Sequence, residues 1–80
     1  MSTHHEIRLG NLGETTNEAF VAQWLVNMGA HVRAGQPIVE MVTDKITIEI
    51  ESDVDGTLVE QRFPAEARVQ SGEVLAIVET

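Results

Sequence analysis

The sequence contains no cysteine and only five basic residues, and each shortage excludes a class of site. Without cysteine there can be no disulfide and no thiolate metal site, and this absence fits a reducing compartment. The formal charge of −8 argues against nucleic acid and anionic membranes as partners, because both bind through clustered lysine and arginine. The longest apolar run, residues 19–26, is interrupted by Gln23 and is far shorter than the roughly 20 residues that cross a bilayer.

Length and composition are those of one small folded domain, residues 1–80, with 42% apolar and 22% charged residues. The first residues lack the basic and apolar segments of a secretory signal. We therefore expect a soluble monomer of the cytoplasm, or of the mitochondrial matrix in a eukaryote. It is expected either as a piece of a longer protein or as a free-standing domain.

Two parts of the chain match each other at an offset of 37 residues. Residues 32–42, VRAGQPIVEMV, and residues 69–79, VQSGEVLAIVE, share valine, glycine and large apolar residues at the same spacing. The same offset sets Val21 against Leu58 in the preceding segments. Two copies are too few for a solenoid, so the repeat predicts one compact domain with internal two-fold pseudo-symmetry.

Short segments rich in β-branched and apolar residues alternate with glycine, proline and Asp-Gly breaks, which is typical of a small all-β sandwich or barrel. One segment also fits helical spacing, at Phe20, Trp24 and Met28. Its counterpart in the repeat ends in Phe63-Pro64, and because proline stops a helix we predict a strand there as well. The predicted strands are residues 6–9, 19–25, 31–33, 37–43, 46–51, 56–63, 68–70 and 73–79.

Lys45 is the only lysine in the chain, and it stands with Asp44 between two predicted strands. Two residues are the length of a tight β-hairpin turn, and a type I turn admits this pair. In the strand that follows, alternation predicts that Ile46, Ile48 and Ile50 face the interior. The turn would hold the Lys45 side chain in water, where another protein can reach it, although position alone also fits a solvated turn lysine with no further role.

Several stretches together resemble the lipoyl domain of the 2-oxo acid dehydrogenase complexes, over about residues 6–79. They are NLGE at 11–14, the segment around Trp24, MGAHVRAGQPIVEMVTDKITIEI at 28–50 and DGTLVEQRFPAEARVQSGEVLAIVE at 55–79. Gly29, sixteen residues before Lys45, and Gly56, eleven after it, add to the match. The resemblance implies an all-β fold, a flattened barrel (barrel-sandwich hybrid) of two four-stranded antiparallel sheets related by a pseudo-two-fold axis.

The resemblance further implies that Lys45 carries lipoate in amide linkage and that the domain is a non-catalytic carrier of a dihydrolipoamide acyltransferase component. The implied partners are a thiamin-dependent 2-oxo acid decarboxylase, the acyltransferase domain, dihydrolipoamide dehydrogenase, and a lipoate ligase or octanoyltransferase. The residues implied in recognition are Thr43, Asp44, Ile46 and, in the loop after the first strand, Glu14. Lipoyl domains commonly have glutamate where this chain has Val42, which bears on partner choice.

Two rival interpretations share the fold. Biotin carriers have a tip that resembles Met-Lys-Met and often an extra protruding loop, so Asp44 before Lys45 and the shortness of the chain favour lipoate. The second rival interpretation is a structural barrel-sandwich domain that is never modified. No nucleophile paired with a base and no phosphate-binding glycine loop is present, so an enzyme is not expected. The three histidines, His4, His5 and His31, are interpreted as surface residues with no metal, and Trp24 as a core residue.

Overall fold

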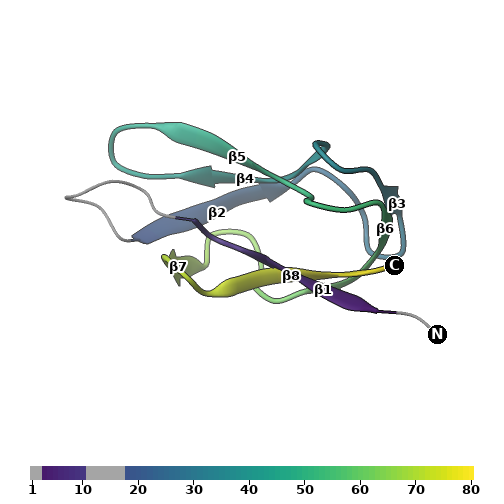
Figure 1. Cartoon of the computed structure of the whole chain (residues 1–80). Helices are drawn as coiled ribbons and strands as arrows, with labels where there is room; N and C mark the ends of the chain where they lie inside the picture. The colour runs from purple at the N-terminus through teal and green to yellow at the C-terminus, as the bar shows by residue number, and fades with distance from the viewer. Residues whose placement is uncertain (1–2, 11–17) are drawn as a thin grey trace.

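The computed structural model describes residues 3–10 and 18–80, and these form eight strands in two four-stranded antiparallel sheets (Figure 1). The strands are β1 (His4–Arg8), β2 (Glu18–Trp24), β3 (His31–Val32), β4 (Pro37–Val42), β5 (Thr47–Glu51), β6 (Gly56–Gln61), β7 (Arg68–Gln70) and β8 (Val74–Glu79). One sheet has the order β1-β8-β6-β3 and the other β5-β4-β2-β7. The predicted flattened all-β barrel is confirmed, and in the segment with helical spacing Phe20 and Trp24 lie on strand β2, whereas Met28 lies in the loop after it.

The offset of 37 residues relates the two sheets in register as well as in sequence. Strand β2 pairs with β4 through Val21 and Met41, and β6 pairs with β8 through Leu58 and Val78, the residues 37 positions later. Each pairing is interrupted by a bulge at the equivalent place, after Val21 and after Leu58. The predicted two-fold pseudo-symmetry is therefore confirmed down to a local irregularity of the backbone.

The core lies between the inner faces of the two sheets. Alternation along the strands directs apolar side chains inward, because successive residues of a strand face opposite ways. Trp24, predicted to be a core residue, is half-buried and packs against this core from its edge, and its Nε1 donates to the carbonyl oxygen of Phe63 at 2.8 Å. The buried cluster comprises Ile7, Leu9, Ala19, Val21, Val32, Ile38, Val39, Met41, Leu58, Val69, Leu75, Ala76 and Val78.

The loops that follow β2 and β6 also match, with one difference in residue type. Gly29 has a φ of 83°, and Glu66, 37 residues later, has a φ of 73°. Their backbone amides donate to equivalent carbonyl oxygens, Gly29 to Leu58 and Glu66 to Val21, both at 2.7 Å. The loop geometry thus requires a left-handed backbone conformation at this position. The second copy of the repeat has glutamate there, a residue type that rarely adopts this conformation.

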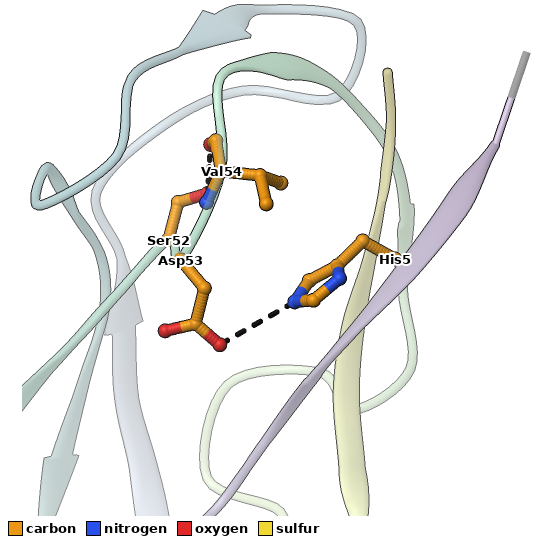
Figure 2. A network of polar contacts seen from close by, with 4 residues as sticks. All are labelled: His5, Ser52, Asp53 and Val54. Carbon is orange, nitrogen blue, oxygen red and sulfur yellow. Dashed lines mark hydrogen bonds and ion pairs between the residues drawn. The ribbon is translucent and has the colours of Figure 1, made fainter.

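The ends of the described chain and the β4–β5 hairpin lie at opposite ends of the barrel (Figure 1). Thr3 and Thr80 pair through their backbones, with Thr80 N donating to Thr3 O at 2.8 Å. Near them, the turn after β5 is held by the buried Ser52 hydroxyl, which donates to Val54 O at 2.6 Å. Figure 2 shows His5 of β1 pointing towards Asp53 in this turn, with Nε2 and Oδ2 3.4 Å apart.

Candidate functional site

The site is the tip of the β4–β5 hairpin, and Thr43 holds it in shape. The Thr43 amide donates to the carbonyl oxygen of Ile46 at 2.8 Å. Its hydroxyl oxygen, Oγ1, accepts the amides of Lys45 and of Ile46, each at 3.1 Å. Neither Asp44 nor Lys45 has a positive φ, so the turn is not of the primed type that requires glycine or asparagine. The predicted hairpin is present, but its connection is longer than the predicted two residues, because Thr43, Asp44, Lys45 and Ile46 all lie between the last paired residues, Val42 and Thr47. The hydroxyl oxygen of Thr43 accepts hydrogen bonds from two of the amides in this connection.

Lys45 is exposed at this tip, together with Asp44. Among the residues that the structure describes, no carboxylate lies within ion-pair distance of the Lys45 ammonium. The base of the hairpin is firm, because Met41 is fully buried and its strand pairs with β5 up to Val42 and Thr47. The hairpin therefore presents the only amine side chain of the protein to solvent on an ordered support.

Ile46 does not face the interior, so that part of the sequence prediction is wrong. Its side chain is 51% exposed, whereas Ile48 and Ile50 are half-buried and pack against the core. The reason is the length of the ladder: β5 begins at Thr47, and Ile46 lies beyond the last strand pair, where no inner face is left to cover it. Alternation thus holds only for the two isoleucines inside the paired strand.

Of the four residues that the resemblance assigned to recognition, Thr43, Asp44 and Ile46 come together around Lys45. Glu14 lies outside the described residues. Sequence reasoning missed Phe20 and Arg68, which the sheet brings to the same end. Phe20 lies directly opposite Val42 on one side and Arg68 on the other, and the Arg68 guanidinium carbon is 5.7 Å from the centre of the Phe20 ring.

The histidines lie apart from this tip. His4 and His5 are on β1 and His31 is on β3, the opposite edge of the same sheet. His4 Nε2 lies 3.1 Å from Glu79 Oε2. No group of three or more metal-ligating side chains occurs within residues 3–10 and 18–80, and the same residues include no helix able to span a membrane.

Comparison with known proteins gives three kinds of relative. Residues 5–78 match the biotin and lipoyl attachment family model, described as "Biotin-requiring enzyme". The chain is 35% identical, over 90% of its length, to the dihydrolipoyllysine-residue acetyltransferase component of the pyruvate dehydrogenase complex of Corynebacterium glutamicum, of which it covers 11%. In general, the chain spans less than a fifth of the length of the curated relatives that it matches.

Two solved structures are similar in fold. The lipoyl domain of the 2-oxoglutarate dehydrogenase complex from Azotobacter vinelandii has a TM-score of 0.69 and 28% identity, covering 90% of this chain and 94% of that one. The urea carboxylase of Kluyveromyces lactis has a TM-score of 0.82 over 95% of this chain and 6% of that one, and at 13% identity this likeness concerns the fold alone. Because the family model matches nearly the whole sequence, this chain belongs to the family of biotin and lipoyl attachment domains.

Proposed function

We propose that the domain is a lipoyl carrier in which Lys45 bears lipoate through an amide bond. The observation that carries this proposal is the sole lysine of the protein, exposed at the tip of the β4–β5 hairpin, which Thr43 holds in shape. A carrier needs its attachment point clear of its own surface, so that enzymes can reach it from several directions. The tip meets this need, since its two central residues are both exposed.

The chain's own part in attachment is small and well defined. The Lys45 amine attacks the carbonyl carbon of an activated carboxylate, such as an acyl adenylate. The N–C bond forms as the activating group leaves, and the ammonium gives up two protons to become an amide N–H. The formal charge of the protein changes from −8 to −9. A neutral arm then enters a partner's channel without the free energy of stripping water from an ammonium group.

Two observations favour lipoate over biotin. The solved lipoyl domain is similar over almost its full length and is 28% identical, and Asp44 rather than an apolar residue precedes Lys45. Once attached, lipoate supplies a disulfide that accepts an acyl group with two electrons and is later reoxidised. The domain itself brings that group to the other components, where tethering replaces free diffusion by a high effective concentration. The proposed partners are a thiamin-dependent decarboxylase, an acyltransferase and dihydrolipoamide dehydrogenase.

The proposal is tested by the intact mass of the domain after incubation with lipoate, ATP and a lipoate ligase. We expect one lipoyl adduct on the wild-type domain and none on Lys45→Arg, which keeps the charge but cannot be acylated under these conditions. Because Lys45 is the only lysine, the α-amino group is the only other amine, and peptide mapping separates the two. An adduct formed instead with biotin and a biotin ligase, or no adduct with either enzyme, contradicts the proposal.

A further inference from the structure

One row of side chains crosses the outer face of the β5-β4-β2-β7 sheet beside the tip. Arg68, Phe20, Val42 and Thr47 are directly opposite one another on four successive strands. Residues directly opposite on paired strands point to the same face. Here that face is the outer one, since Phe20 is 40% exposed and Thr47 and Arg68 are exposed, with Val42 half-buried between them. We refer to these four residues as the Phe20 row.

The pseudo-symmetry supplies an internal comparison for the Phe20 row. The equivalent row of the other sheet consists of His31, Thr57, Glu79 and His4, which are likewise opposite one another on four strands. There, threonine stands in the place of Phe20 and glutamate in the place of Val42. The same backbone thus accepts polar residues throughout this row, so the fold does not require the apolar pair. That pair occurs in the half of the molecule that bears the lysine.

The neighbouring row makes an acidic border. Glu40 and Glu49 lie directly opposite each other, an arrangement of like charges that disfavours strand pairing, and Asp44 adds a carboxylate at the tip. Glu40 accepts a long hydrogen bond of 3.4 Å from Gln23. An apolar centre with a charged border is the usual anatomy of a protein interface. The partner that fits it has an apolar pocket flanked by lysine or arginine.

The Phe20 row begins beside the tip, because two of its residues, Val42 and Thr47, belong to the hairpin that bears Lys45. Val42 is three residues before Lys45 and Thr47 two residues after it, so at about 3.3 Å per residue these two residues lie within about 10 Å of the Lys45 backbone, and Phe20 is on the next strand. An enzyme that forms a bond at Nζ must close over the tip. Enzymes that act on the loaded group work at the far end of a long arm and have less need to touch this face.

We propose that the enzyme that attaches lipoate to Lys45 docks on the Phe20 row. This inference rests on the proposed lipoyl function. Phe20 and Val42 enter an apolar pocket of that enzyme, and Glu40, Glu49 and Asp44 face its basic border. Arg68, stacked on Phe20 at 5.7 Å and 3.9 Å from Glu18, holds the ring in position. Arg68 is therefore a positioning residue for the interface.

The test compares initial rates of lipoylation of the unmodified domain at several domain concentrations, read from intact mass. Phe20→Thr introduces the residue found at the equivalent position 57, and Val42→Thr keeps the shape of valine while replacing one methyl group with a hydroxyl. We expect each to lower kcat/KM by about tenfold, mainly through KM, as for the loss of an interface anchor. Met28→Thr is the matched control, because Met28 is 53% exposed and lies in the β2–β3 loop outside the row.

Circular dichroism and thermal melting establish that each variant is folded before rates are compared. Higher salt is expected to raise KM for the wild type and for Met28→Thr alike, because it screens the acidic border. The inference is wrong if Phe20→Thr and Val42→Thr are lipoylated at the wild-type rate, if Met28→Thr is slowed as much, or if only later acylation by a decarboxylase is affected. Failure of the proposed function is distinct, since then the wild-type domain itself acquires no lipoyl group.

Discussion

Among the glycines that the structure describes, Gly56 on strand β6 is the one where an added methyl group meets the closest contacts. A Cβ built on Gly56 would overlap the carbonyl oxygen of Glu79 on β8 and come within 2.8 Å of Val78 Cγ1. The first of these contacts is with backbone, which cannot turn away as a flexible side chain can. Strands β6 and β8 must therefore separate locally in Gly56→Ala, and they form the middle of their sheet.

The expected loss of stability is about 2 kcal/mol, in the range of about 1–3 kcal/mol found when a packed core receives an extra methylene. An 80-residue domain has a free energy of unfolding of about 4–12 kcal/mol, so the expected loss is a large fraction of the total stability. The melting temperature should fall by about 10 °C, at about 4–8 °C per kcal/mol for a domain of this size. Replacing glycine by alanine where alanine fits has the opposite sign, because it reduces the entropy of the unfolded chain.

The assay is urea unfolding followed by circular dichroism, with thermal melting as a second measurement. Gly10→Ala is the matched control, because a Cβ at Gly10 meets no atom of residues 3–10 and 18–80 within 4 Å and its φ is not positive. We expect Gly10→Ala to change stability by less than about 0.5 kcal/mol. If Gly56→Ala is as stable as Gly10→Ala, the close approach of β6 and β8 is not a constraint, and the reasoning is refuted.

Three further substitutions test the tip, the left-handed loop and the contact between the sheets. Thr43→Val removes the acceptor of two tip amides, so we expect slower lipoylation with stability changed by less than about 1 kcal/mol. Thr43→Ser keeps the hydroxyl and should restore the rate. Equal rates of lipoylation for the wild type, Thr43→Val and Thr43→Ser would show that the hydroxyl does not shape the tip for the attaching enzyme. Glu66→Gly should raise the free energy of unfolding by about 0.5–1 kcal/mol in urea, because glycine adopts a φ of 73° freely, and a loss of stability would contradict this account. Trp24→Phe removes the donor to Phe63 O and should lower stability by about 1 kcal/mol in the same assay, whereas no change would mean that water replaces this bond fully.

Local patterns in the chain predicted much of the site. The strands on either side of Asp44-Lys45 and the two-residue gap between them predicted an exposed lysine at a hairpin tip, because turn length and strand alternation are properties of neighbouring residues. The alternation pattern predicted the wrong face for Ile46. The position at which two strands stop pairing depends on the partner strand and on the opposite sheet, and not on the local pattern. The role of Thr43 in the turn was not predicted, because it depends on the orientation of one hydroxyl.

What the sequence by itself determined is the set of strands, their duplication and the single lysine between two of them. These features follow from side-chain periodicity and turn residues, which act over a few positions. Only the tertiary structure decided which distant residues meet: Phe20 with Val42 and Arg68 beside the tip, and Gly56 against the backbone of Glu79. The register between strands sets these contacts, and bulges after Val21 and Leu58 shift that register in a way that no local pattern specifies.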